Sequence, residues 1–208
     1  LGLQLPWFSQ ALAGCTSPYV VCLEAGVVVQ SPEWLAQLLL YTQFESVCVV
    51  APIIVAADGS IEEAGRLLSK EGALPAMRGW DRALDGHAGS LSCAREVAAV
   101  SGICALASRE TLDRLGGLSA SYATLRYAWI DFSLKALEHG LSCIVTPQTM
   151  VRRAVGQPVE PVHQYGLDRH ILQELWRDRL RAGDPYHNPD FSTSDGGYQA
   201  RPTSERVL

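Results

Sequence analysis

The first charged residue of the chain, and the first candidate for chemistry, is Glu24, which interrupts an otherwise apolar stretch between Tyr19 and Val29. A continuous apolar run of this length is typical of a strand that is buried on both faces of a sheet. Ligands of open α/β sheets bind beyond the carboxyl ends of the strands, so Glu24 is a candidate for binding or catalysis. A solvated turn residue is an equal alternative at this position.

The rest of the chain predicts the elements that would position Glu24. Helices are expected over residues 7–14, 31–41, 108–116, 129–139 and 167–182, and strands over 19–29, 47–55, 97–107 and 143–145. Residues 65–96 lack a sustained period, and we expect a long excursion of short helices or hairpin pieces. This order predicts an α/β fold with a mainly parallel or mixed sheet flanked by helices. We expect one domain over residues 1–190 and a polar tail over 191–208.

Composition excludes several classes of protein. Apolar residues make up 48% and charged residues 19% of the 208 residues, which is typical of a globular chain. The net charge of -5 argues against a nucleic-acid-binding domain, and no apolar run is long enough for a membrane span. Six cysteines without a C-x-x-C pair indicate reduced thiols and a cytoplasmic location. The sequence begins at Leu1 without a leader pattern, so we expect a piece of a longer protein.

Five short motifs follow one another along the chain. They are Glu24 with Ser31-Pro32-Glu33-Trp34-Leu35, then Asp58-Gly59-x-Ile61-x-x-Ala64-Gly65, Ser101-Gly102 with Leu115-Gly116-Gly117-Leu118, Asp131-Phe132-x-Leu134-Lys135-Ala136-x-Glu138-x-Gly140, and Asp184-Pro185-Tyr186-His187-Asn188-Pro189-Asp190-Phe191-Ser192. In this order and spacing the chain resembles bacterial family 2 glycosyltransferases of the GT-A fold, especially those that build surface polysaccharides. The likeness begins part-way into that family's domain and lacks its opening nucleotide-binding strands. We therefore expect an open sheet edge where those strands would pair.

The resemblance implies a nucleotide-sugar donor, a glycan acceptor and inverting transfer. It also implies a manganese or magnesium ion that bridges the diphosphate, and a carboxylate that deprotonates the acceptor. A metal held by carboxylates would neutralise the charge that develops on the leaving group. By the same resemblance Ser101, Gly102 and Trp129 line the acceptor pocket, although Trp129 is equally suited to packing.

The residues at the implied catalytic positions depart from the family pattern. Its acid-any-acid metal motif falls on Glu24-Ala25-Gly26, so Glu24 is at most the one metal ligand there. Its Glu-Asp pair falls on Ala128-Trp129, which leaves Asp131 as the catalytic candidate. Its late histidine falls near Arg152-Arg153.

Two accounts follow from these departures. In the favoured one, metal-dependent transfer is lost, and the domain is a binding or scaffold module that partners an active glycosyltransferase. In the other, Arg152 and Arg153 neutralise the donor diphosphate, because guanidinium groups suit phosphate oxygens, and Asp131 or Glu24 is the base. An acid in the first turn of a helix also favours the helix dipole, which gives Asp131 a purely structural interpretation.

Overall fold

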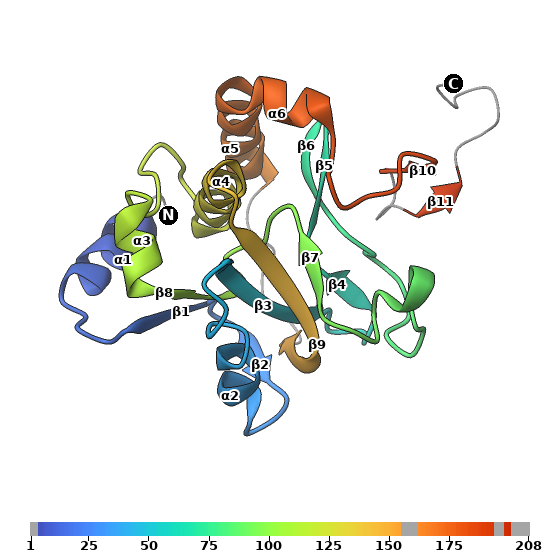
Figure 1. The fold of residues 1–208 in the computed structure, drawn as a ribbon, viewed down its shortest axis with the longest axis horizontal. Coiled ribbons are helices and arrows are strands. Elements are labelled where there is room, and N and C mark those ends of the chain that lie inside the picture. The colour runs from blue at the N-terminus through green and yellow to red at the C-terminus, as the bar shows by residue number, and fades with distance from the viewer. Residues whose placement is uncertain (1–3, 155–161, 194–197, 201–208) are drawn as a thin grey trace.

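The computed structural model describes residues 4–154, 162–193 and 198–200 (Figure 1). Its elements are α1 (Gln4–Ala13), β1 (Tyr19–Leu23), β2 (Val27–Val29), α2 (Trp34–Leu39), β3 (Val47–Val55), β4 (Ile61–Glu63), β5 (Arg66–Ser69), β6 (Gly72–Pro75), the 3-10 helix η1 (His87–Gly89), β7 (Arg95–Val97), β8 (Cys104–Ser108), α3 (Arg109–Arg114), α4 (Leu125–Glu138), β9 (Ser142–Arg153), α5 (Val162–Leu175), α6 (Arg177–Ala182), β10 (Phe191–Ser192) and β11 (Gln199–Ala200).

The central sheet has the strand order β1-β8-β3-β9-β2, with β4 paired to β3 and β7 paired to β9. The predicted α/β class with a mixed sheet is confirmed. Parallel pairing is found between β3 and β9, and the other pairs of this sheet among the described strands are antiparallel. The expectation of a mainly parallel sheet, which is based on the order of the elements, therefore overestimates the number of parallel strand pairs. β1 forms one edge of the sheet.

The strand expected over residues 143–145 is much longer than predicted, because β9 continues past Pro147 to Arg153. The register with β3 jumps from Pro52 opposite Thr146 to Ile53 opposite Met150. Proline has no N–H to donate to a sheet, so a bulge here lets the ladder resume beyond it. The continued strand carries the end of β9 to the level of Glu24 and pairs it with β2.

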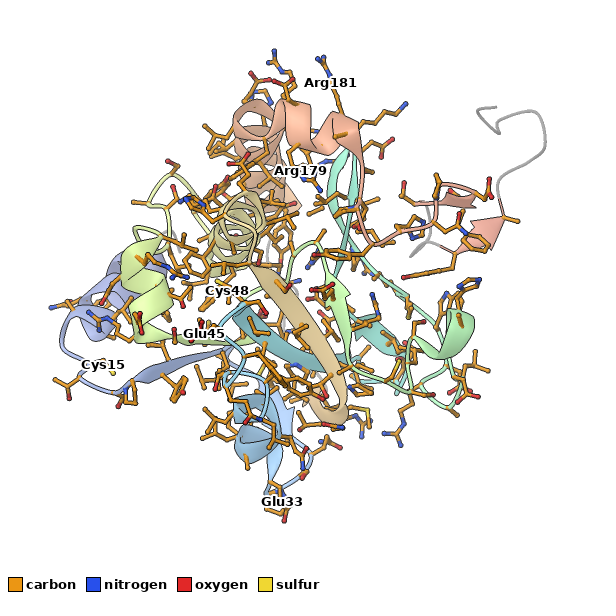
Figure 2. The ribbon with its side chains drawn as sticks, in the orientation of Figure 1. Cys15, Glu33, Glu45, Cys48, Arg179 and Arg181 are labelled. Carbon is orange, nitrogen blue, oxygen red and sulfur yellow. The ribbon has the colours of Figure 1, made fainter. Side chains whose placement is uncertain are left out.

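Helices cover both faces of the sheet (Figure 1). Alternate residues of β3 point to opposite faces, as the two-residue period of a strand requires. Val49, Ala51 and Ile53 share a core cluster with Trp129 and Phe132 of α4. On the other face, Val50 and Ile54 pack with Leu38 of α2. Figure 2 shows Cys48 among the interior side chains and Glu33 at the outer end of α2.

Helix α4 begins earlier than predicted, at Leu125 instead of Trp129. The side chain of Thr124 caps the helix by accepting a bond from the Tyr127 N–H, and Thr124 is itself held by Asp168 of α5. Asp131 consequently lies in the second turn, so the expectation that it sits in the first turn is wrong. The earlier start also places Arg126 on the helix, where it faces Glu24.

Three other segments differ from the sequence expectation. The strand expected over residues 97–107 is two strands, β7 and β8, and Ser101-Gly102 lies in the buried segment between them. The helix expected over 167–182 breaks at Trp176 into α5 and α6. The hairpin expected within residues 65–96 is found as β5 and β6. In the tail, β10 pairs with β11, while residues 194–197 and 201–208 lie outside the described part of the chain.

All six cysteines are free thiols, and four of them are buried. Burial raises the pKa of Cys22, Cys104 and Cys143 to about 12, so these thiols stay protonated. Within the described residues, no helix has the length and apolar character needed to cross a membrane.

Candidate functional site

Glu24 follows the last residue of β1 and turns its carboxylate toward two arginines from distant parts of the chain. Its backbone N–H donates to the carbonyl of Ile103 at 2.8 Å, which fixes the end of the strand. One carboxylate oxygen lies 2.9 Å from Nη2 of Arg126 on α4, and the other lies 3.0 Å from Nη1 of Arg153 on β9. The Glu24 side chain is only 20% exposed. Glu24 is therefore a mostly buried, ion-paired residue at the end of β1 and not a solvated turn residue.

Glu62 on β4 is the fourth member of an ion-pair network that also contains Glu24, Arg126 and Arg153. Its two oxygens accept bonds of 2.7 Å from Nε and Nη2 of Arg153, which is the bidentate geometry that suits a guanidinium and a carboxylate. Burial alone would raise the pKa of Glu62, but the hydrogen bonds and charge of Arg153, with the charges of Arg126 and Arg66, hold it below its ordinary value. The hydrogen bonds that Arg153 donates to Glu62 raise the pKa of Arg153 in turn. Both groups are therefore charged.

Glu63, the next residue of β4, lines the same cavity and forms a second, more buried pair. It lies 2.5 Å from Nη2 of Arg66, and the hydroxyl of Ser101 donates to its other oxygen at 2.5 Å. Glu63 and Arg66 are 3% and 7% exposed. The turn between them needs Gly65, which has a φ of +83° and whose Cβ would lie 2.7 Å from Val97.

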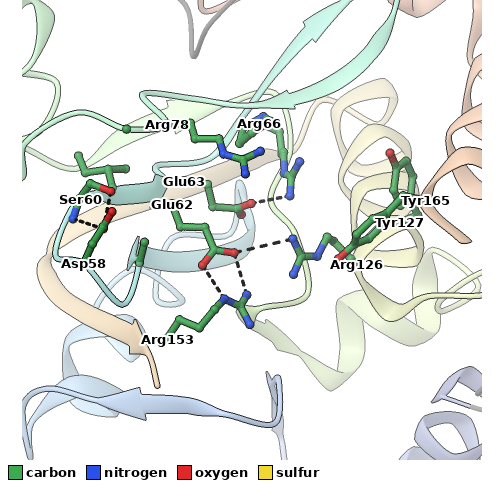
Figure 3. Close-up of a pocket in the computed structure, with 14 residues that line it drawn as sticks. Asp58, Ser60, Glu62, Glu63, Arg66, Arg78, Arg126, Tyr127, Arg153 and Tyr165 are labelled. Atoms are coloured by element: carbon green, nitrogen blue, oxygen red, sulfur yellow. Dashed lines mark hydrogen bonds and ion pairs between the residues drawn. The ribbon is translucent and has the colours of Figure 1, made fainter. Parts of the chain in front are cut away.

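A cavity of about 440 Å³ opens beside these pairs (Figure 3). Its lining residues come from the loop before β4, from β4 to β6, from the turn that follows β6, and from α4, β9 and α5. They are Ala56, Asp58, Ser60, Ile61, Glu62, Glu63, Arg66, Pro75, Arg78, Gly79, Arg126, Tyr127, Arg153 and Tyr165. This volume falls within the range of small-molecule sites, about 300–1,000 Å³.

The residues proposed for the donor diphosphate do not lie together. Arg153 joins Glu24, but Arg152, its neighbour on the strand, points to the other face and is exposed. Arg152 donates to the carbonyl of Ala57 at 2.6 Å and lines a separate cavity of about 130 Å³. Adjacent strand residues face opposite sides of a sheet, so these two guanidinium groups cannot converge on one phosphate without distorting β9.

Asp131, the catalytic candidate, is 2% exposed and does not line the cavity. It accepts bonds from Nε1 of Trp176 at 2.8 Å and from the hydroxyl of Tyr122 at 3.2 Å, and pairs with Nζ of Lys135 at 2.8 Å. These contacts join α4 to α6 and to the loop before α4. In this position Asp131 connects packed elements.

The three residues proposed for an acceptor pocket are all buried. Ser101 bonds to Glu63, and Trp129 is fully buried with its ring edge-on to Phe8 and Phe132. Gly102 packs directly under the Trp129 indole. None of the three lines the cavity beside Glu62.

Gly102→Ala is expected to lower the free energy of unfolding by about 1–3 kcal/mol, because overpacking a rigid core is destabilising. A Cβ at this position would lie 2.5 Å from Cδ1 of Trp129 and 3.1 Å from the carbonyl oxygen of Leu125. Urea denaturation measures the change. Gly166→Ala on α5 is the matched control, since nothing lies within 4 Å of its new Cβ and alanine favours a helix. A Gly102→Ala protein as stable as the parent would contradict this packing.

Sequence reasoning missed four members of the network, namely Glu62, Glu63, Arg66 and Arg126. A signal was present in the Asp58-Gly59 motif, where two adjacent acids stand between the apolar residues Ile61 and Ala64. Adjacent acids in a short, buried strand must each be paired with a cation, because an unpaired buried charge is costly.

The divalent cation that the resemblance implies does not fit these residues. Both oxygens of Glu24 are engaged by the guanidinium groups of Arg126 and Arg153, and Glu62 is paired with the same two arginines, closely with Arg153 and at 3.9 Å with Arg126. In the part of the chain that the structure describes, no group of three His, Cys, Asp or Glu residues is placed to hold a metal ion. Magnesium and manganese need several oxygen ligands, and two adjacent cations would repel them.

Comparison with known proteins supports the fold. The structure is similar to the crystal structure of GalNAc-T7 with UDP, GalNAc and Mn²⁺, with a TM-score of 0.60 and 15% identity over 85% of this chain and 35% of that chain. This likeness shows a GT-A glycosyltransferase fold. The chain is also 29% identical over 191 residues to the uncharacterized protein y4gI of Sinorhizobium fredii (strain NBRC 101917 / NGR234), covering 88% of this chain and 21% of that protein. The chain thus spans about a fifth of this relative's length. No protein-family model matches the chain.

Proposed function

We propose that this domain is a glycosyltransferase-like module of glycan assembly, related to the bacterial family 2 enzymes that build polysaccharides, in which metal-dependent sugar transfer does not operate at Glu24. The GT-A fold supports the glycosyltransferase part of this proposal. The observation that carries the rest is the pairing of both Glu24 oxygens with Arg126 and Arg153. The free thiols suit a reducing, cytoplasmic setting.

The cost of breaking these pairs explains why a metal would not replace the arginines. Arg153 is shared by Glu24 and Glu62, and its side chain is only 10% exposed. Turning it away would remove the bidentate partner of Glu62 and leave Glu24 with Arg126 alone, both at partly buried positions, which is unfavourable. Binding of a diphosphate would also require these ion pairs to break, because Arg126 and Arg153 are already paired with Glu24 and Glu62.

Isothermal titration with nucleotide sugars, with and without Mn²⁺, tests this proposal. UDP-, GDP- and dTDP-sugars are expected to show no binding that depends on Mn²⁺, and radiolabelled donors to show no metal-dependent transfer or hydrolysis. Micromolar, Mn²⁺-dependent binding that Glu24→Gln abolishes would overturn the proposal, since it would require Glu24 to leave its arginines and ligate the metal.

A scaffold module that partners an active glycosyltransferase, in the same or another chain, is the second candidate. The short span of this chain on y4gI favours it, because most of that protein lies outside the match. The two candidates differ in ligand binding. If this domain binds neither donor nor glycan, while its removal lowers transfer by a co-expressed partner domain, the scaffold role is favoured.

A further inference from the structure

Ion pairs engage most of the charged groups around the cavity, and among the described residues one carboxylate and one arginine remain outside these pairs. Arg126 and Arg153 neutralise Glu24 and Glu62, and Arg66 neutralises Glu63. The remaining carboxylate at the cavity is Asp58, whose pKa is lowered by hydrogen bonds from the backbone and hydroxyl of Ser60, and more weakly by the charge of Arg152 outside the cavity.

Arg78 is the additional cation. It lines the cavity, and within the described residues it forms no ion pair. Figure 3 shows its side chain lying on the same side of the cavity as Arg66. Arg66 is 7% exposed, and its Nε has no hydrogen-bond partner within the part of the chain that the structure describes. Among the described residues, the guanidinium of Arg78 lines the cavity without an ion pair, and such a group is suited to bind an oxyanion.

The backbone around Arg78 is held in a strained turn. Met77 is fully buried and has a φ of 57°, although it is not glycine, and Gly79 has a φ of 79°. The N–H of Gly79 donates to the carbonyl of Ile61 at 2.8 Å, and the N–H of Ile61 donates to the carbonyl of Trp80 at 2.9 Å. Strained residues of this kind persist where the surrounding structure over-determines them, and they cluster at binding sites. The turn fixes the base of the Arg78 side chain beside β4.

The rest of the cavity wall is aromatic and apolar. Tyr127 of α4 and Tyr165 of α5 line it, together with Ile61 and Pro75. The guanidinium of Arg126 lies 5.3 Å from the centre of the Tyr165 ring, which holds that ring in place. Burial raises the pKa of Tyr127, so its hydroxyl remains a hydrogen-bond donor. Aromatic rings beside polar donors are suited to the C–H face and hydroxyl groups of a pyranose.

We infer that this cavity binds a saccharide that carries a carboxylate or phosphate group, without a metal ion, with the anionic group on Arg78 and the sugar ring against Tyr127 and Tyr165. The inference rests on the proposed function in taking the ligand to be a glycan unit. The anionic group pairs with Arg78, which forms no ion pair within the described residues. A uronate and a sugar phosphate share this chemistry.

The test is isothermal titration and heteronuclear NMR of the protein in EDTA. The probes are glucuronate, glucose 6-phosphate, neutral glucose and inorganic phosphate. We expect the two anionic sugars to bind more tightly than glucose and inorganic phosphate, with shifts at Arg78, Tyr127 and Tyr165. Whichever of glucuronate and glucose 6-phosphate binds more tightly shows whether the site prefers a carboxylate or a phosphate group.

Arg78 can be changed without disturbing the core, because it is exposed and outside the ion-pair network. Arg78→Ala is expected to weaken binding of the anionic sugar by about tenfold or more, the usual worth of a hydrogen bond to a charged group. Arg78→Lys should restore part of the affinity. Arg82→Ala removes the same charge from a nearby exposed position outside this cavity, and binding should be unchanged.

Equal binding of glucose and glucuronate, equal binding of inorganic phosphate and the sugar phosphate, or an Arg78→Ala protein that binds normally would each overturn the inference. These results leave the proposed function standing, since that proposal concerns Mn²⁺ and Glu24. Mn²⁺-dependent nucleotide-sugar binding would overturn the proposed function and would not alter the preference for anionic sugars measured in EDTA.

Discussion

Arg153→Ala is expected to lower the free energy of unfolding by about 3 kcal/mol, the size of loss that follows when one partner of a buried ion pair is removed. Arg153 makes two hydrogen bonds of 2.7 Å to Glu62 and one of 3.0 Å to Glu24. The side chains of Glu24 and Glu62 are 20% and 18% exposed, so water can solvate them only in part after the cation is gone. Urea denaturation followed by circular dichroism measures the loss.

The adjacent residue provides a matched control. Arg152→Ala removes an equal charge from the same strand, but this side chain is exposed and bonds to one carbonyl, so the expected loss is below about 1 kcal/mol. Replacing Glu62 by Gln in the Arg153→Ala protein should recover part of the stability, because it removes the partly buried charge that has lost its bidentate partner. Equal losses for the two arginine variants would contradict the network.

The sequence contains a clear signal for Glu24 and almost none for its partners. A single acid within an apolar run must end a strand or be paired, so Glu24 stands out from local pattern alone. Arg126 resembles an ordinary surface charge, and the adjacent acids Glu62 and Glu63 indicate pairing without indicating the partners, because the pairing depends on the approach of α4, β4 and β9. Arg126 and Glu24 are 102 residues apart in the chain, and no local period records that contact.

The errors in element boundaries have the same non-local origin. The pattern of apolar residues places the start of α4 at Trp129, but the cap at Thr124 is held by Asp168, which lies 44 residues further along. Pro147 is a good local reason to end a strand, yet a bulge opposite Pro52 lets β9 continue to Arg153. The order of elements is enough to predict the α/β class. The site could not be predicted in the same way, because it depends on the start of α4 and the end of β9, and tertiary contacts set both of these boundaries.

Asp131→Ala is expected to cost about 3 kcal/mol of unfolding free energy, because it removes a buried charged acceptor from three donors. Trp176 and Tyr122 are 9% and 3% exposed, so their N–H and O–H groups would lose a partner that water cannot easily replace. The charge and hydrogen bond of Asp131 also help burial to raise the pKa of Tyr122, which keeps that hydroxyl a donor. Thermal and urea unfolding measure the loss.

Asp131→Asn separates this structural role from a catalytic one. The amide keeps an oxygen that accepts from Trp176 and Tyr122 at nearly the same place, and it loses chiefly the 2.8 Å pair with Lys135, whose side chain is 30% exposed. We therefore expect Asp131→Asn to retain most of the stability that Asp131→Ala loses. If Asp131 were the base in sugar transfer, Asp131→Asn would abolish activity while the protein stayed folded, since an amide cannot take the proton. An Asp131→Asn protein with unchanged stability and no activity, beside an active parent, would assign Asp131 to the chemistry instead of to the joint between α4 and α6.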